Sequence, residues 1–359
     1  MKNNSRKSKI FQAALFGVSV GFLVYFCVSG NNLFLLAGSL PGLNMMWLVG
    51  AFGCVALNWV MDGRIIQCLV GHGRAEGYTF RQAFKVTMVG QYFNSITPYA
   101  VAGQPMQLVS LIRQGVPSGA AISSLVRKFL VYQTTITGFS LLVILVKYQF
   151  FQQKIQGFMA LAVIGFVYQA AVVAVLALFT FSPGFTTRLI EGVVWLLTRI
   201  RVVKDPQQTS RHVRDQLQFY LESNRQMKDS RALTARVYGC TLVQLTALFS
   251  VPFFIYKAFH SPGLPLADMI AAQSFVTMVS SYTPLPGAAG AAEGSFLVLF
   301  QMFFSDKIIR QAMLLWRLIA YYSCILVGAF FAGFDSRKER QKSGPGRRNG
   351  SPVADKGVK

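Results

Sequence analysis

The chain has 359 residues, of which 53% are hydrophobic and 13% are charged. The apolar residues form blocks of about 20, the length of helix needed to cross roughly 30 Å of hydrocarbon. This composition excludes an ordinary soluble protein and indicates a protein that crosses a membrane several times. The 35 Lys and Arg outnumber the 13 Asp and Glu, but they lie at block ends and in connections, as in cytoplasmic segments of membrane proteins, so we do not expect nucleic-acid binding.

Six uninterrupted apolar blocks predict six full membrane spans. They are Ile10–Val28, Leu43–Met61, Ala120–Val146, Gly157–Phe181, Ala235–Lys257 and Ile308–Phe334. The basic stretch MKNNSRKSK precedes the first block and no small-residue cleavage site follows it, so we expect an uncleaved first span that begins in the cytoplasm. Basic residues after the last block place the C-terminus on the same side.

Two further apolar blocks, Phe84–Leu111 and Asp268–Phe304, are interrupted by the sequences NSITPYAVAGQP and YTPLPGAAGAAEGSF. Irregular backbone is tolerated at membrane depth only where protein or a water-filled cavity surrounds it. When the full spans are followed from the N-terminus, the first block falls on the cytoplasmic side and the second on the outer side. They therefore predict two re-entrant helical hairpins that enter from opposite faces, with their Gly/Pro segments at the protein's centre.

The two halves of the chain, residues 43–146 and 235–334, resemble each other. Three residues of the first break match three of the second, namely Ser95, Thr97 and Pro98 with Ser281, Thr283 and Pro284. Two later pairs also match, Arg127 with Arg317 and Tyr132 with Tyr322. An inverted repeat is typical of transporters whose site lies near the middle of the membrane. The predicted fold is an all-α polytopic membrane protein with about six full spans and two re-entrant helical hairpins in an inverted repeat.

Residues 1–334 are thus expected to form one integral membrane domain. Within it, residues 182–232 have a helical apolar pattern and predict an amphipathic segment at the cytoplasmic surface. Residues 335–359 are rich in Gly, Pro and basic side chains, which predicts a disordered basic cytoplasmic tail.

Arg127 and Arg317 each fall near the ninth or tenth residue of a predicted span, which places them roughly 15 Å deep. A central Arg costs about 2.5–3.5 kcal/mol on insertion, so each must face a cavity or a partner. They predict a cationic site for a phosphate group; alternatively, they are structural groups that cap hairpin carbonyls or pair with Glu293. Glu293 itself would balance Arg317, receive a cationic headgroup, take up a proton or stabilise a helix start.

The Pro and Gly residues of the two breaks predict half-helices that end and restart inside the membrane. A half-helix that begins there offers free N–H groups and a positive dipole end to an anion. The alternative is a kink that serves packing alone. We expect the substrate site to include Tyr322 and these hairpin residues: Thr97, Pro98, Gly103, Gln104, Thr283, Pro284, Gly287 and Gly290.

Soluble-type catalysis has no visible machinery in the sequence. The five cysteines are scattered and no His/Cys cluster has metal spacing, so we expect no metal site. No Ser-His-Asp set, P-loop or dinucleotide fingerprint occurs, so we expect no catalytic residues and no cofactor.

The sequences TPLPGAAGAAEGSFLVLFQMF and AMLLWRLIAYYSCILVG resemble the membrane region of the lysylphosphatidylglycerol synthase/flippase family, also named phosphatidylglycerol lysyltransferases. The resemblance covers roughly residues 10–334 and is most specific in the T-P-x-P-G and E-G elements with the Arg and Tyr that follow. It departs at residues 286–290, where the family usually has P-G-G-x-G. It implies a flippase of a bacterial plasma membrane, with Arg317, Glu293 and the hairpin glycines near the headgroup path.

The resulting hypothesis is a lipid translocase that moves an anionic or aminoacylated phospholipid, such as lysyl-phosphatidylglycerol, between leaflets. Its partner is then membrane phospholipid, with a separate lipid aminoacyl transferase and a second copy of the chain, as a homodimer, as further candidates. Family synthases also carry a soluble domain that transfers lysine from lysyl-tRNA, and we find no place for that activity here, so we do not expect an enzyme. The alternatives are a phosphatidylglycerol lysyltransferase and a small-solute secondary transporter coupled through Glu293.

Overall fold

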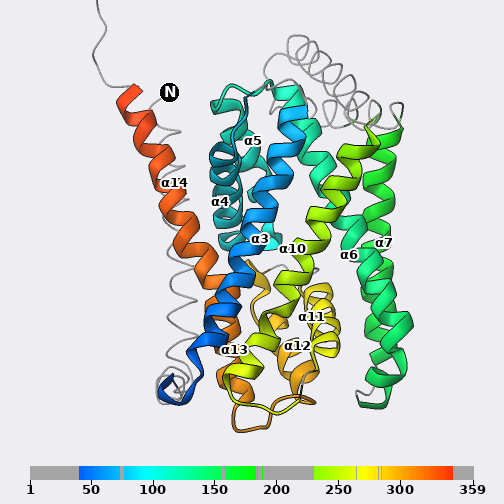
Figure 1. Cartoon of the computed structure of the whole chain (residues 1–359). Helices are drawn as coiled ribbons and strands as arrows, with labels where there is room; N and C mark the ends of the chain where they lie inside the picture. The colour runs from blue at the N-terminus through cyan, green and yellow to red at the C-terminus, as the bar shows by residue number, and fades with distance from the viewer. Residues whose placement is uncertain are drawn as a thin grey trace, which may run out of the picture.

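A computed structural model of the chain describes residues 40–72, 77–154, 158–182, 230–263, 265–281, 283 and 285–342, with the single residues 184, 188 and 192. Every regular element in these residues is a helix, as predicted for an all-α membrane protein (Figure 1). The predicted first span and most of the predicted amphipathic segment at 182–232 lie outside the described residues.

The longer helices are α3 (Met45–His72), α4 (Phe80–Ile96), α5 (Gly103–Arg113), α6 (Ser118–Lys154), α7 (Phe158–Phe181), α10 (Arg231–Ala258), α11 (Leu266–Ser280), α12 (Ala291–Phe300), α13 (Ile309–Arg317) and α14 (Ser323–Lys342). Three short 3₁₀ turns accompany them, η1 (Leu40–Gly42), η2 (Pro98–Ala100) and η3 (Pro286–Ala288). A π-helical segment, η4 (Leu318–Tyr322), joins α13 to α14.

Within the described residues, four helical stretches are long and apolar enough to cross a membrane: Met45–His72, Ser118–Gln153, Arg231–Ala258 and Ile309–Gly333. They coincide with four of the six predicted spans, and the chain is a polytopic membrane protein. A fifth predicted span coincides with α7, in which the apolar stretch Ala162–Leu178 is shorter.

Beyond the last span the helix is longer than predicted. We expected a disordered tail from residue 335, but α14 continues to Lys342, and residues 343–359 lie outside the described residues. The extension consists mainly of Arg, Lys, Glu and Gln, which are good helix formers.

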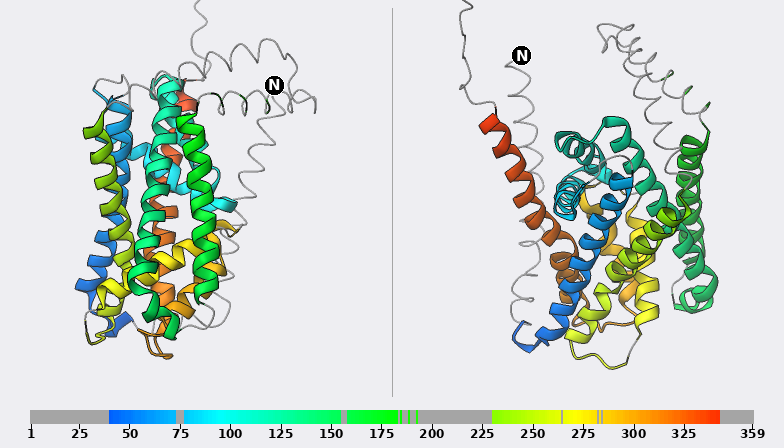
Figure 2. Two further views of the ribbon diagram at one scale, coloured as in Figure 1. Left: turned by 90° about the vertical axis from the view of Figure 1, so that its right-hand side faces the viewer. Right: turned by 45° about the horizontal axis from the view of Figure 1, so that its top comes forward.

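The helices are arranged around one central pair. Helices α3 and α10 lie side by side, run in opposite directions and share the most extensive helix contact in the described part of the chain (Figure 1). The hairpin of α4 and α5 packs toward one end of this pair, and the hairpin of α11 and α12 toward the other. Their breaks η2 and η3 contact each other between the two ends. Figure 2 shows α6 and α7 along one side of this arrangement, with α14 on the other.

A proline preceded by an extended residue opens the short turn at each break: Pro98 directly after α4 and its C-cap, and Pro286 only after residues 281–285, which follow the end of α11 at Ser280. The residue before a proline is disfavoured in the helical region, and both Thr97 (φ −114°, ψ 145°) and Leu285 (φ −93°, ψ 148°) are extended. Each proline is then followed by two residues with left-handed φ, Tyr99 and Ala100 in η2 and Gly287 and Ala288 in η3.

The two turns have the same backbone shape, and aligning them pairs different residues of the two breaks than the sequence match did. The sequence match paired Pro98 with Pro284, whereas the two turns of the same shape begin at Pro98 and Pro286. Pro284 itself lies outside the described residues. The elements nevertheless follow one order twice: α3, α4, η2, α5 and α6, and then α10, α11, η3, α12 and α13–α14.

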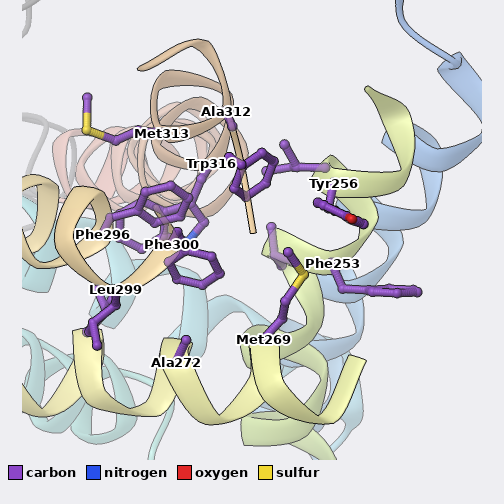
Figure 3. Close-up of a cluster of buried hydrophobic side chains, with 14 of the residues drawn as sticks. Phe253, Tyr256, Met269, Ala272, Phe296, Leu299, Phe300, Ala312, Met313 and Trp316 are labelled. Carbon is purple, nitrogen blue, oxygen red and sulfur yellow. The ribbon is translucent and has the colours of Figure 1, made fainter. Parts of the chain in front are cut away.

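A buried aromatic cluster holds the second hairpin in place (Figure 3). The ring of Phe296 on α12 stacks on Phe300, with centroids 4.2 Å apart, and on Trp316 of α13, with centroids 5.0 Å apart. Phe253 of α10 and Met269 of α11 belong to the same cluster. Because Trp316 directly precedes Arg317, this apolar packing holds in place the turn of α13 that carries the arginine.

Candidate functional site

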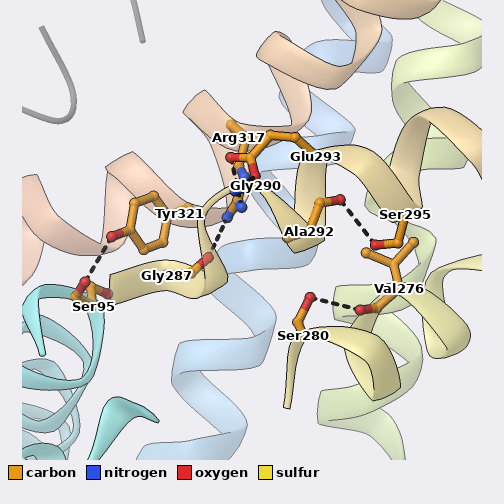
Figure 4. A network of polar contacts seen from close by, with 10 residues as sticks. All are labelled: Ser95, Val276, Ser280, Gly287, Gly290, Ala292, Glu293, Ser295, Arg317 and Tyr321. Carbon is orange, nitrogen blue, oxygen red and sulfur yellow. Dashed lines mark hydrogen bonds and ion pairs between the residues drawn. The ribbon is translucent and has the colours of Figure 1, made fainter. Parts of the chain in front are cut away.

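The guanidinium of Arg317 lies where the two hairpin breaks meet. Its side chain is buried, and Nη1 donates to the carbonyl oxygen of Gly287 in η3 at 3.0 Å (Figure 4). Nη2 forms an ion pair with Glu293 Oε1 at 2.8 Å. The rings of Trp316 and Tyr321 flank the guanidinium at 5.1 and 5.3 Å. Its Nε and Nη2 are buried and make no hydrogen bond among the described residues, so that Nη2 has only its ion pair and Nε has no partner.

Glu293 is positioned by the start of α12. It is the third residue of the helix, and its Oε2 accepts the N–H of Gly290 at 2.6 Å. Such a carboxylate satisfies an N–H group that the first helical turn leaves unpaired. The two structural alternatives considered for Glu293, a partner of Arg317 and a helix-start carboxylate, are therefore both present in one side chain.

Tyr321 connects the second half of the chain to the first. Its hydroxyl donates to the carbonyl oxygen of Ser95, near the end of α4, at 2.7 Å. Its ring lies against Gly287, where an added Cβ would stand 2.4 Å from ring carbon atoms. Two features therefore require glycine at position 287: its left-handed φ of 60° and the close approach of the Tyr321 ring. Sequence matching selected the neighbouring Tyr322, whose ring packs on Tyr321 with centroids 5.0 Å apart.

A cavity of about 310 Å³ opens beside this network and is lined from both halves of the chain; we call it the Arg317 cavity. Of the predicted site residues, Thr283, Gly287 and Arg317 line it. Asn94 and Tyr99 of the first hairpin also line it, with Gln273 from α11. The amide oxygens of Asn94 and Gln273 are buried and have no hydrogen-bond partner among the described residues.

A second cavity, of about 590 Å³, is lined mainly by the first half of the chain, with Gln244, Leu248, Ala320 and Cys324 from the second half; we call it the Lys128 cavity. It shares Asn94, Tyr99 and Ala100 with the Arg317 cavity, so the two adjoin at η2. Lys128 Nζ on α6 donates to Asp62 Oδ2 on α3 at 2.8 Å. We had not predicted this ion pair, because Asp62 directly follows an apolar block and resembled the end of a span.

The predicted residues of the first hairpin are divided between roles. Gln104 lines the Lys128 cavity. Thr97 caps the break, because its hydroxyl donates to the carbonyl oxygen of Phe93 at 2.7 Å and accepts the N–H of Ala102 at 3.3 Å. Gly103 allows the side chain of Asn94 to approach, since an added Cβ would stand 1.9 Å from its Oδ1. Pro98 is exposed at the start of η2.

Arg127 lies apart from this arrangement. Its Nη2 donates to the hydroxyl of Thr234 on α10, and Arg127 lines neither of the two cavities in the described part of the chain. Its role in substrate binding stays a prediction, and the structure gives it a specific structural contact instead. The next residue, Lys128, lines the Lys128 cavity instead.

Two similarities to known proteins extend over most of the chain. A family model described as the lysylphosphatidylglycerol synthase TM region matches residues 10–328, which include both hairpins and both cavities. A protein of Archaeoglobus fulgidus named UPF0104 membrane protein is 23% identical over 294 residues, which cover 79% of this chain and 84% of that protein.

Proposed function

Because the chain belongs to the family of the lysylphosphatidylglycerol synthase TM region, we propose that it moves a phospholipid between the two leaflets of a membrane. The phosphate of the lipid headgroup binds at Arg317 while the acyl chains remain in the bilayer. The observation that carries this proposal is a buried guanidinium with a free Nε donor beside a cavity lined by both hairpin breaks.

The chemistry of arginine supports a phosphate ligand. A guanidinium presents its donors in a planar fork that matches phosphate oxygens, and it stays charged when buried. A charged side chain inside a membrane protein is costly and usually marks a substrate path. Glu293 offsets this cost in the absence of lipid, and the phosphate takes its place or shares the guanidinium when lipid is bound.

The arrangement of the elements supports movement between two sides. The same succession of helices occurs twice, and the hairpins lie toward opposite ends of the α3–α10 pair with their breaks in contact. Inverted repeats with interrupted helices expose a central site alternately to each side of the membrane. In this proposal the two hairpins are re-entrant, both termini are cytoplasmic, and the membrane is the plasma membrane of a bacterium.

Leaflet exchange in proteoliposomes tests the proposal. Vesicles containing fluorescently labelled phosphatidylglycerol or lysyl-phosphatidylglycerol are treated with a membrane-impermeant reductant, which removes only outer-leaflet fluorescence unless the lipid exchanges. Vesicles with the wild-type protein should lose the inner-leaflet signal as well, whereas protein-free vesicles and vesicles with an unrelated polytopic protein should retain it. Retention of the inner-leaflet signal for both lipids by folded wild-type protein would contradict the proposal.

Arg127→Met is expected to affect stability but not lipid exchange. The substitution removes the hydrogen bond to Thr234, and hydrogen bonds to charged groups contribute about 1.5–3 kcal/mol. The exchange rate should stay at the wild-type level, because Arg127 lines neither cavity. Denaturant or thermal unfolding in detergent measures the stability, and the vesicle assay measures the exchange rate. If stable Arg127→Met protein lost lipid exchange, Arg127 would belong to the substrate site after all.

A further inference from the structure

In the Lys128 cavity the cation, Lys128, is more exposed than its acidic partner, Asp62. Asp62 is 3% exposed, and both carboxylate oxygens have donors, Oδ2 from Lys128 at 2.8 Å and Oδ1 from the Gln244 amide at 3.3 Å. When side chains alone are compared, 16% of the Lys128 side chain is exposed and 4% of the Asp62 side chain. An ammonium group has three donors, and only the one to Asp62 is used among the described residues. The other two are available to a ligand in the cavity.

The acid near the Arg317 cavity is also paired, and it does not line the cavity. Glu293 uses Oε1 for Arg317 and Oε2 for the N–H of Gly290. A headgroup that brings an extra ammonium group would therefore meet no unpaired carboxylate among the described residues that line either cavity, because Asp62 is already paired with Lys128 and no other acid lines them. Burying a charge without a counter-charge is costly. An anionic group, by contrast, finds the free donors of Lys128 and the Nε of Arg317.

The remaining polar lining suits uncharged hydroxyl groups. Asn58, Gln104 and Gln107 contribute side-chain amides to the Lys128 cavity. Asn94 lines both cavities, and its amide oxygen is a buried acceptor that no described residue satisfies. Buried polar atoms normally have a partner. A hydroxyl donor of a polyol or sugar headgroup supplies one without adding charge.

We propose that the Lys128 cavity is a second headgroup site, and that together the two cavities select an anionic phosphodiester lipid with a hydroxyl-bearing headgroup over one that carries an added amine. The phosphate interacts with Lys128 in one cavity and with Arg317 in the other. The hydroxyl groups bond to the amides that line the cavities. This inference rests on the proposed lipid translocation and specifies its substrate.

The first test compares two lipids that differ by the added amine. In the vesicle assay, wild-type protein should exchange phosphatidylglycerol faster than lysyl-phosphatidylglycerol by about tenfold or more, since a buried ammonium group without a partner is strongly disfavoured. Equal rates, or faster exchange of the lysyl lipid, would overturn the inference and leave the proposed translocation intact. Exchange of neither lipid by folded protein would instead reject the proposed translocation itself.

The second test removes the cation. Lys128→Met should slow phosphatidylglycerol exchange by about tenfold or more, because the truncation of one member of a buried charge pair has large effects. Lys147→Met is the matched control: Lys147 lies on the same helix and pairs with Asp268 at 2.7 Å, but it lines neither cavity. It should exchange phosphatidylglycerol at the wild-type rate.

Two more variants distinguish ligand binding from support of the fold. Asp62→Asn keeps the cation and should keep the preference for phosphatidylglycerol. The double variant Asp62→Asn/Lys128→Met leaves neither charge buried alone, so it should fold and lose the preference. A double variant that retained both the rate and the preference would overturn the inference, and so would a loss of preference in Asp62→Asn with Lys128 in place.

Discussion

Arg317→Met is expected to abolish lipid exchange and to lower the free energy of unfolding by about 3–5 kcal/mol. Arg317 is 5% exposed and Glu293 is 8% exposed, so removal of the guanidinium leaves a buried carboxylate without its counter-charge. It also leaves the carbonyl oxygen of Gly287 without its side-chain donor. Unfolding in detergent measures the stability, and the vesicle assay measures the exchange.

The double variant Arg317→Met/Glu293→Gln separates the two effects. Replacement of a buried ion pair by neutral side chains of similar size is often neutral for stability, so most of the lost stability should return. Lipid exchange should not return, because the donors for the phosphate are still absent. A double variant that exchanged lipid at the wild-type rate would mean that the Arg317–Glu293 pair is structural only.

Gly287→Ala is expected to have the second large effect. A left-handed conformation costs a non-glycine residue about 1–2 kcal/mol, and overpacking adds about 1–3 kcal/mol. The new Cβ would stand 2.4 Å from the ring of Tyr321, which must move and release its bond to Ser95. Because the carbonyl oxygen of the same residue holds Arg317, we expect lipid exchange to fall with stability.

Gly290→Ala is the matched control for this substitution. Gly290 also has a left-handed φ, of 83°, but an added Cβ would meet no atom within 4 Å. It should therefore lose only the conformational contribution, which at ψ −51° is that of a strained γ-type turn, and should suffer no overpacking against Tyr321. Equal losses for the two variants would show that contact with Tyr321 contributes little.

The hairpins and the central arginine were predictable because each has a local cause. Proline and glycine interrupt a helix whatever surrounds them, and both breaks lie within the Pro/Gly segments that the sequence singled out. An arginine in the middle of an apolar block must find partners, and Arg317 has Glu293, which was one of its expected partners.

The charged pair of the first half could not be predicted in the same way. Successive residues of an α-helix point about 100° apart, so Arg127 and Lys128 face different neighbours, and sequence alone does not say which of them faces the cavity. The repeat match selected Arg127, but the two halves differ in register by two residues at the breaks. Asp62 went unnoticed because α3 extends to His72, beyond the apolar block that defined the predicted span.

The contact between the two breaks has a consequence for how the protein is made. Residues at the first break bond to partners that follow far later in the chain, as Ser95 does with Tyr321, and η2 packs on η3. During synthesis the first hairpin emerges long before these partners exist. Until then, the N–H and C=O groups that are unpaired at its break need water as a hydrogen-bond partner, because the hydrocarbon core contains none. With the re-entrant topology proposed above, we therefore expect insertion of the first hairpin to be a late step that the second half of the chain completes.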